Sequence, residues 1–224
     1  MAETLYAIYG ASGFGREVMP LAVNYFNKKG IDRGCLFFID DGISEDEVNG
    51  CKVVKYSDFK KLNSDSKKVS LAIADSRTRS KLADLIENDG MKSWQLKHEN
   101  VVELFDVSIK EGAILCPFVT LTSNINIGKC FHANIYSYVA HDCRIGDFVT
   151  FAPGVKCNGN VVVEDHAYIG TGAVIKQGTP GRPLIIGEGA VVGMGAVVTR
   201  SVLAGDTVIG NPAKSLSRKN LRSK

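Results

Sequence analysis

A chain of 224 residues is long enough to form one large domain or two small ones. Apolar residues make up 45% of it and charged residues 23%, which is the composition of an ordinary soluble globular protein. The net charge of +3 is too small to argue for binding to nucleic acid. Part of the basic surplus lies near the C-terminus and is typical of a solvated chain end: Arg218, Lys219, Arg222 and Lys224.

The sequence also indicates where the protein works. No apolar run approaches the roughly 18 residues that a membrane span needs, and the N-terminus lacks a charged and then apolar signal region. The six cysteines, at positions 35, 51, 116, 130, 143 and 157, show no C-x-x-C pairing. Free buried thiols in a reducing cytosol fit this spacing better than disulfides or a zinc site. We therefore expect a cytoplasmic protein that holds no metal.

The chain begins with a predicted strand at residues 4–9, a glycine-rich turn at residues 10–15 and a helix at residues 16–26. Backbone N–H groups at such a helix start attract an anion, so the turn is a candidate phosphate site. Its spacing, G-x-x-G-x-G, differs from the dinucleotide pattern G-x-G-x-x-G, which argues against NAD. A tight turn without a ligand is the open alternative. The candidate contacts are Gly10, Ser12 and Gly13.

Acidic residues follow two further predicted strands. Residues 35–39 end at Asp40 and Asp41, and residues 69–74 end at Asp75, which opens a helix through about residue 87. Acids at the carboxyl end of a parallel strand lie at the ligand crevice of an open α/β sheet, so all three are candidate substrate contacts. The alternatives are a loop cap for Asp41 and a helix N-cap for Asp75.

A last short strand is predicted at residues 93–96, and the pattern up to this point predicts a small Rossmann-like α/β domain over residues 1–100. After His98, apolar residues recur every six positions. Neither a helix, with a period of 3.6, nor a strand, with a period of 2, produces that spacing. The residues at this step, which we refer to as anchors, are Ile109, Leu115, Leu121, Ile127, Ala133, Val139, Ile145, Phe151, Cys157, Val163, Ile169 and Ile175, then, five residues out of phase, Ile186, Val192, Val198 and Ala204.

A period of six predicts a solenoid, because three six-residue faces complete one 18-residue coil of a parallel β-helix. The residue four after an anchor is usually small or branched, as a narrow triangular core demands: Ala113, Val119, Val149, Val155, Ala167, Ala173, Ala190 and Ala196. The five extra residues fall within positions 177–183, where Gly and Pro predict a loop that leaves the coil. We expect the β-helix domain to occupy residues 101–224, with coils from Val101 to Val208 and every anchor pointing inward.

One of the four histidines is a candidate catalytic group. His141 lies two residues after the anchor Val139 and is followed by Asp142. One coil further on, the equivalent position is Gly159. Stacked strands lie about 4.8 Å apart, so a backbone shelf without a side chain is expected beside the imidazole, with room for a thioester carbonyl. The alternative is an exposed solenoid histidine without a role. The remaining histidines are interpreted as structural: His98, His132 and His166.

Five motifs span both predicted domains: Tyr9-Gly10-Ala11-Ser12-Gly13-Phe14-Gly15, Phe38-Ile39-Asp40-Asp41, His141-Asp142-Cys143-Arg144-Ile145-Gly146-Asp147-Phe148, Cys157-Asn158-Gly159-Asn160 and Gly210-Asn211-Pro212-Ala213-Lys214. In combination they resemble the bacterial sugar acyltransferases of the hexapeptide-repeat type. That family includes the sialic-acid O-acetyltransferases and the nucleotide-amino-sugar N-acetyltransferases of bacillosamine and perosamine type. The resemblance implies a left-handed parallel β-helix, a homotrimer with active sites between neighbouring solenoids, and acetyl-CoA bound along the coils.

The resemblance also implies roles for single residues. The turn at residues 10–15 would meet the phosphates of a nucleotide-linked sugar, and Asp40 or Asp41 its base. His141 would be the general base, with Asn134 near the reacting group of the sugar, and Gly159 would offer its N–H to the acetyl carbonyl. The groove for CoA would be lined by Thr171, Gly193, Met194, Gly195 and Lys214.

The chain departs from the pattern of the family that it resembles at three points. Some members carry a histidine where this chain has Phe14, and another where it has Thr150. Phe14 offers no polar contact to a phosphate or sugar. The usual His-Pro opening of the β-helix is His98-Glu99 here.

The expected function is acetyl transfer from acetyl-CoA to a nucleotide-linked amino sugar, of the 4-amino-4,6-dideoxy type, for lipopolysaccharide or other surface glycans. The amine attacks directly, His141 accepts a proton and Asp142 orients the imidazole. Two alternatives remain open. One is O-acetylation of a sialic-acid-type sugar, and the other is a non-catalytic scaffold that binds a nucleotide sugar.

Overall fold

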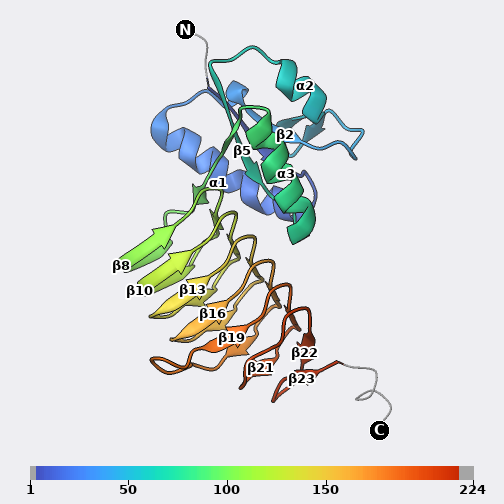
Figure 1. The fold of residues 1–224 in the computed structure, drawn as a ribbon. Coiled ribbons are helices and arrows are strands. Elements are labelled where there is room, and N and C mark those ends of the chain that lie inside the picture. The colour runs from blue at the N-terminus through green and yellow to red at the C-terminus, as the bar shows by residue number, and fades with distance from the viewer. Residues whose placement is uncertain (1–3, 217–224) are drawn as a thin grey trace. The chain divides into compact units, whose positions relative to one another are not determined.

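The protein folds into two compact units, Met1–Leu96 and Lys97–Lys224. A computed structural model describes residues 4–216 (Figure 1). The basic tail predicted to be solvated, Arg218 to Lys224, lies outside the described residues. No helix within residues 4–216 is long and apolar enough to cross a membrane.

The first unit is an α/β sandwich around a six-stranded sheet of order β3-β4-β2-β1-β5-β6. All its neighbouring strands run parallel except the hairpin β3-β4. The strands are β1 (Thr4–Tyr9), β2 (Leu36–Ile39), β3 (Glu47–Val48), β4 (Cys51–Val54), β5 (Ser66–Leu71) and β6 (Lys92–Ser93). The helices are α1 (Gly13–Lys29), a 3₁₀ turn (Arg33–Cys35), α2 (Tyr56–Lys61) and α3 (Ser76–Asn88).

Local chemistry sets the helix ends in this unit. Gly30 ends α1 in the left-handed conformation, with φ of 64°, and its N–H donates to the carbonyl of Asn27. Tyr6 packs against both Phe26 and Trp94, with ring centroids 5.0 and 4.8 Å away, and these contacts fix α1 and the end of β6 against the sheet. The structure corrects the prediction for the third strand, because β5 ends at Leu71 and not at residue 74.

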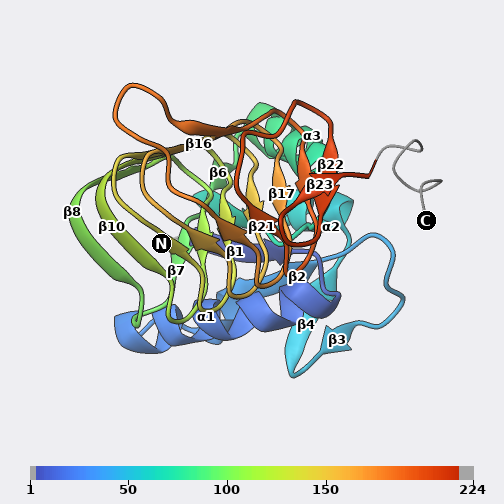
Figure 2. The same cartoon turned by 90° about the horizontal axis from the view of Figure 1, so that it is seen from below.

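The second unit is a parallel β-helix with three faces (Figures 1 and 2). Its first face carries β9 (Ile114–Leu115), β11 (His132–Ala133), β14 (Thr150–Phe151), β17 (Tyr168–Ile169), β20 (Val191–Val192) and β22 (Thr207–Ile209), with β23 (Lys214–Ser215) antiparallel at the end. The second carries β12 (Tyr138–Val139), β15 (Lys156–Cys157), β18 (Val174–Ile175) and β21 (Val197–Val198). The third carries β8 (Val102–Ile109), β10 (Thr120–Ile127), β13 (Cys143–Ile145), β16 (Val161–Val163) and β19 (Leu184–Ile186). The chain enters this unit through β7 (Leu96–Lys97).

The strand register confirms the predicted coil length. Ala133 pairs with Phe151 and Cys157 with Ile175, so neighbours in the stack are 18 residues apart. Strand β10 turns a corner, because Leu121 pairs with Val139 on the second face while Ile127 pairs with Ile145 on the third. Val163 pairs with Ile186, which adds the five residues of the predicted loop to one coil.

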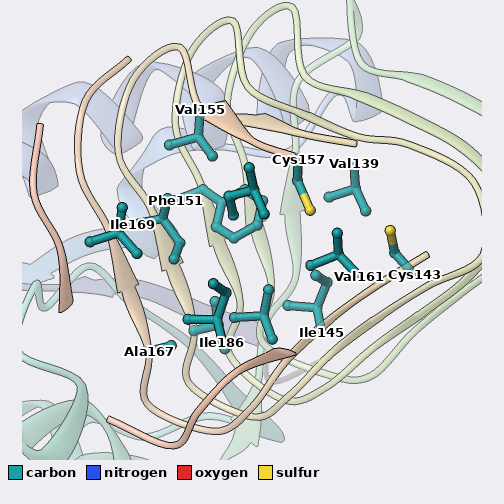
Figure 3. Close-up of a cluster of buried hydrophobic side chains, with 14 of the residues drawn as sticks. Val139, Cys143, Ile145, Phe151, Val155, Cys157, Val161, Ala167, Ile169 and Ile186 are labelled. Atoms are coloured by element: carbon teal, nitrogen blue, oxygen red, sulfur yellow. The ribbon is translucent and has the colours of Figure 1, made fainter. Parts of the chain in front are cut away.

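The anchors and the residues four positions after them form one continuous core (Figure 3). The thiols of Cys143 and Cys157 point into it beside Val139 and Ile145, and all four side chains are almost fully buried. Full burial of a branched aliphatic side chain stabilises a fold by about 1.5–3 kcal/mol, so the core is the main source of stability. The six cysteines have free thiols.

Two anchors differ from the prediction. Ile109 is only partly buried, because it lies in β8, the first strand of the stack. Ala204 is exposed, and the prediction that it points inward is wrong. The last coil is two residues shorter than the 18-residue repeat: Ile186 pairs with Val202, and Val192 with Val208. Val202 and Val208 therefore fill the core positions in that coil.

The corners of the solenoid repeat in columns of left-handed residues. One column contains Asp106, Asn124, Asp142 and Asn160, with φ between 54° and 58°. A second begins with Phe118 and Tyr136, whose rings stack with centroids 4.9 Å apart and planes within 8°. Left-handed backbone costs an L-residue about 1–2 kcal/mol, and Asn and Asp tolerate it best. Contacts between corner side chains of neighbouring coils offset part of that cost.

Candidate active site

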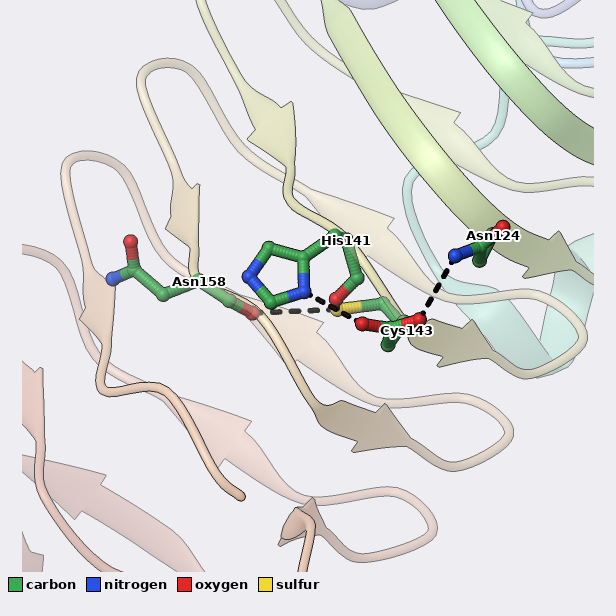
Figure 4. Close-up of polar contacts among 5 residues, drawn as sticks. Asn124, His141, Cys143 and Asn158 are labelled. Atoms are coloured by element: carbon green, nitrogen blue, oxygen red, sulfur yellow. Dashed lines mark hydrogen bonds and ion pairs between the residues drawn. The ribbon is translucent and has the colours of Figure 1, made fainter. Parts of the chain in front are cut away.

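His141 lies at a corner of the solenoid, two residues after the end of β12 (Figure 4). Its Nδ1 is 2.7 Å from Asp142 Oδ2, and Asn124 Nδ2 donates to Asp142 Oδ1 over 3.1 Å. The hydrogen bond with His141 has the larger effect and that from Asn124 the smaller, and together they hold the pKa of Asp142 below its ordinary value. An ionised carboxylate at Nδ1 favours the tautomer with the proton on Nδ1, which leaves the lone pair on Nε2 available as a base.

The ring of His141 lies against Gly159 of the next coil. A Cβ at Gly159 would be 2.5 Å from both Cε1 and Nε2 of the imidazole, so no other residue type fits with the ring in place. Gly159 has no left-handed φ, and its glycine is required by this close approach alone. The backbone shelf predicted beside His141 is present. Among residues 4–216, no acceptor is found for the Gly159 N–H.

Hydrogen bonds fix the two chain segments that flank the imidazole, one around His141 and one around Gly159. Asn160 N–H donates to the carbonyl of His141 over 3.0 Å, and the Cys143 thiol donates to the carbonyl of Asn158 over 3.3 Å. The amide of Asn158 donates to Ile175 and accepts from the hydroxyl of Tyr138. His141 itself remains exposed, with 56% of its side chain accessible, so a substrate can reach it.

The other histidines have structural environments, as the sequence predicts. The Nδ1 of His98 accepts from the backbone N–H of Asn100. His132 is 1% exposed in β11, and His166 stacks on Phe148 with ring centroids 5.3 Å apart.

In the α/β unit, the glycine-rich turn is fixed by Asp40. Ala11 N–H donates to Asp40 Oδ2 and Gly42 N–H to Asp40 Oδ1, each over 2.9 Å. Gly15 must be glycine, because a Cβ there would lie 1.8 Å from the carbonyl oxygen of Gly10. A Cβ at Gly13 would meet nothing within 4 Å, so the start of α1 is open to a ligand.

Asp41 is engaged within the fold as well. It accepts from the hydroxyl of Tyr9 over 2.7 Å and from the N–H of Tyr56 over 2.9 Å. Burial and then the bond to Asp41 raise the pKa of the Tyr9 hydroxyl. Lys55, which the sequence did not indicate, donates to the carbonyls of Asp40, Asp41 and Ile43 over 3.4, 3.0 and 2.5 Å. A lysine among three carbonyls holds the segment at residues 40–43 in one shape.

Asp75 is the N-cap of α3. Its Oδ1 accepts from Thr78 N–H over 2.7 Å, and the hydrogen bonds from Thr78 lower its pKa. The structure therefore shows the helix N-cap that was predicted as the alternative role of Asp75. Arg79 is fully buried and donates to the carbonyls of Ile73 and Ala74, so it fixes the loop between β5 and α3. No sequence pattern indicates that contact, because the partners are backbone atoms.

The remaining candidates on the solenoid lie away from the corner that carries His141. Asn134 is buried, and its side chain donates to the carbonyl of Phe151 over 2.8 Å. Thr171 follows β17 and accepts from Gly195 N–H, while Met194 is 81% exposed beside it. Gly193 packs under Ile209, and Lys214 is exposed in β23. Within one chain, His141 follows the second face, whereas these residues follow the first or lie in its last strand.

A parallel β-helix with an exposed His–Asp pair over a glycine shelf defines an acyltransferase of the hexapeptide-repeat class. Residues 6–86 match the family described as the PglD N-terminal domain. The chain is 51% identical over 214 residues to the GDP-perosamine N-acetyltransferase of Escherichia coli O157:H7, a match that covers 96% of this chain and 97% of that relative. It belongs to this family of sugar N-acetyltransferases.

Two solved structures are similar over almost their full length. WeeI from Acinetobacter baumannii AYE has a TM-score of 0.93 and 60% identity, covering 95% of this chain and 100% of that one. The acetyltransferase domain of PglB from Neisseria gonorrhoeae FA1090, in complex with acetyl coenzyme A, has a TM-score of 0.81 and 25% identity, covering 96% of this chain and 100% of that one. The predicted family, fold class and enzyme class are confirmed.

Proposed function

We propose that this protein transfers the acetyl group of acetyl-CoA to the amine of a GDP-linked amino sugar, with GDP-perosamine as the acceptor, in the synthesis of a surface glycan. The observation that carries the proposal is the His141–Asp142 pair over Gly159, in a chain that matches a GDP-perosamine N-acetyltransferase over nearly its whole length. The PglB domain, which binds acetyl-CoA, supports the donor.

The mechanism follows from the geometry of the pair. The hydrogen bond to Asp142 keeps a proton on Nδ1 of His141, so Nε2 is free to accept one. Nε2 takes a proton from the amine while the amine attacks the thioester carbonyl. The oxygen of the tetrahedral intermediate gains negative charge, which the N–H of Gly159 would stabilise. Collapse breaks the C–S bond, and the imidazolium returns the proton to the thiolate. The products are an N-acetyl sugar and CoA, and no acyl-enzyme is required.

The α/β unit supplies the proposed nucleotide site. The open start of α1, with Gly10, Ser12 and Gly13, suits the phosphates, because N–H groups at a helix start attract anions. Asp40 and Asp41 each keep further acceptor capacity on both carboxylate oxygens, since each oxygen accepts one bond in the fold. Asp75 is a further proposed contact to the acceptor, and its Oδ1 also caps α3.

We also propose a homotrimer. His141 and the proposed CoA contacts Thr171, Gly193, Met194 and Gly195 follow different faces of the solenoid, so a neighbouring copy has to bring the two corners together. Phe118, Tyr136 and Met194 are exposed by 49%, 63% and 81%, which suits burial against another copy. Light scattering at micromolar concentration should give three times the chain mass, and a monomer would refute the shared site.

We propose a cytoplasmic location as well, and the free thiols support it.

Release of the CoA thiol tests the acceptor. GDP-perosamine should be turned over with a higher kcat/KM than the corresponding UDP- and dTDP-linked amino sugars. Turnover of a hydroxyl acceptor such as a sialic-acid-type sugar, with no turnover of any amino sugar, would overturn the proposal in favour of O-acetylation. Failure of every acceptor would favour a binding scaffold.

A further inference from the structure

A basic hollow of about 420 Å³ lies on the solenoid outside the residues considered so far. Three cationic side chains line it, and none of the residues that line it is acidic. Three hydroxyl side chains and one amide, that of Gln177, complete the polar lining. The cationic and hydroxyl residues are Lys176, Arg182, Arg200, Thr179, Thr199 and Ser201. Cations and hydroxyls together, without a carboxylate, are the groups that bind phosphate.

The loop that forms one wall of the hollow is held in a defined shape. In Figure 2 it is the orange segment before β19 that extends beyond the neighbouring coils. Its tip is a tight turn, in which Thr179 and Arg182 exchange two backbone hydrogen bonds of 3.1 and 2.9 Å. At its base, the N–H of Gly178 donates to the carbonyl of Gly159 over 3.0 Å, and the N–H of Leu184 donates to the carbonyl of Asn160 over 3.1 Å. A Cβ at Gly178 would lie 2.2 Å from the carbonyl oxygen of Asn160, so the base closes only around glycine.

The same Gly159 forms the shelf under His141, and the register connects the two sites. Val139, Cys157, Ile175 and Val198 are stacked partners on the second face. Lys176 directly follows Ile175, and Arg200 follows Val198 by two residues, as His141 follows Val139. Arg200 therefore lies three coils from His141, which is about 14 Å at about 4.8 Å per coil.

We propose that this hollow binds the diphosphate of acetyl-CoA. The inference rests on the proposed position of the thioester at His141. The pantetheine arm between thioester and diphosphate contains about fourteen bonds, and an extended chain advances about 3.5 Å for every three bonds, so the arm reaches about 16 Å. That length matches the spacing between His141 and Arg200. The loop at residues 178–183, which interrupts the six-residue period, thus supplies Thr179 and Arg182 to the donor site.

The charges favour this ligand. A diphosphate linkage carries two negative charges and offers several oxygens to Lys176, Arg182 and Arg200. The Oγ of Ser201 accepts from Ile185 N–H over 3.0 Å, so its hydroxyl proton points elsewhere and can be donated to a phosphate oxygen. A GDP-linked acceptor also contains a diphosphate, and the test must separate the two sources.

Titration calorimetry on the full-length protein, without acceptor, separates them. The variants are Arg200→Met and Lys176→Met, and the matched control is Arg33→Met, an exposed arginine of the α/β unit hydrogen-bonded to Asn27. The ligands are acetyl-CoA, acetyl-dephospho-CoA, S-acetylpantetheine and GDP. Melting temperature and light scattering establish that each variant folds and assembles as the parent does.

We expect Arg200→Met and Lys176→Met to raise the Kd of acetyl-CoA and of acetyl-dephospho-CoA by about tenfold each, because each removes a hydrogen bond between charged groups. The Kd values of S-acetylpantetheine and GDP should not change, and Arg33→Met should alter none of the four. An unchanged Kd for acetyl-CoA would overturn the proposal. A loss of affinity for acetyl-CoA alone would also overturn it, because it would assign the hollow to the 3′-phosphate. So would a loss of affinity for GDP alone. If the acceptor proposal fails, these binding results still stand, because no acceptor is present.

Discussion

Replacement of Gly159 by alanine tests the catalytic geometry most directly. The new Cβ would lie 2.5 Å from Cε1 and Nε2 of His141, and the three atoms nearest to it all belong to that ring. Because nonbonded carbon atoms settle at about 3.5 Å, the imidazole has to move by about 1 Å. A displacement of that size costs about 100-fold in rate. Since each tenfold corresponds to about 1.4 kcal/mol, the barrier rises by about 2.7 kcal/mol.

Alanine keeps the N–H proposed for the oxyanion, and the backbone at residue 159 is not left-handed, so the substitution acts on the imidazole and leaves the chain unstrained. We expect kcat of Gly159→Ala, measured by release of the CoA thiol at saturating substrates, to fall about 100-fold at an unchanged melting temperature. His141→Ala should lower kcat by about 10² to 10⁴. The double variant should equal His141→Ala alone, because the ring that alanine displaces is gone.

Two results would refute this reasoning. A Gly159→Ala enzyme with a kcat within threefold of the parent would mean that the position of the imidazole does not control the rate. A double variant much slower than His141→Ala would mean that Gly159 acts by a route independent of the ring.

Three further predictions concern the fold around the site. Lys55→Met, which removes the bonds to the carbonyls at residues 40–43, should raise KM for the nucleotide sugar several-fold and leave KM for acetyl-CoA unchanged; equal changes in both would show a general loss of structure. Asp75→Ala should lower the free energy of unfolding by about 1 kcal/mol in urea melts at pH 7. Because the folded pKa of Asp75 is lowered, this contribution is present above the ordinary carboxyl value of about 4 and is lost as the pH falls through the folded value, so a difference that did not shrink as the pH falls would contradict the cap assignment. Ile145→Asp places a charge in the core, where Ile145 is 4% exposed, at a cost of several kcal/mol; circular dichroism should show an unfolded solenoid, and a folded, active variant would contradict the register.

The solenoid was predictable because its signal is a strict period. Anchors such as Leu115 and Ile169 are fully buried, because the same six-residue pattern is repeated in each coil. The prediction failed at Ala204, because the last coil is two residues shorter than the 18-residue repeat and the core positions shift to Val202 and Val208. The helix α2 and the hairpin β3-β4 were not predicted, because segments of two to six residues carry too little periodicity.

The site was predictable only where a repeat relates its residues. His141 and Gly159 are one coil apart, so the sequence alone brings them together, and the structure places the ring on the glycine. Lys55 and Arg79 were missed because their partners are backbone carbonyls, which no side-chain pattern records. Asp40 and Asp41 were predicted as substrate contacts from their place at a strand end, and that role stays a prediction. Their bonds to Ala11 and Tyr9 were not predicted, because they depend on tertiary packing.

The left-handed corners affect how this enzyme could have arisen. Asp142 occupies the same corner column as Asp106, Asn124 and Asn160, with the same backbone conformation and with Asn124 bonded to its side chain. The turn that aims the carboxylate at His141 is therefore a standard part of the coil, present whether or not a reaction occurs there. The features specific to this corner are the ring of His141 and the absence of a side chain at residue 159. A non-catalytic solenoid of this kind would be a few substitutions away from an acid–base pair, because the strained backbone is already stabilised by the stack.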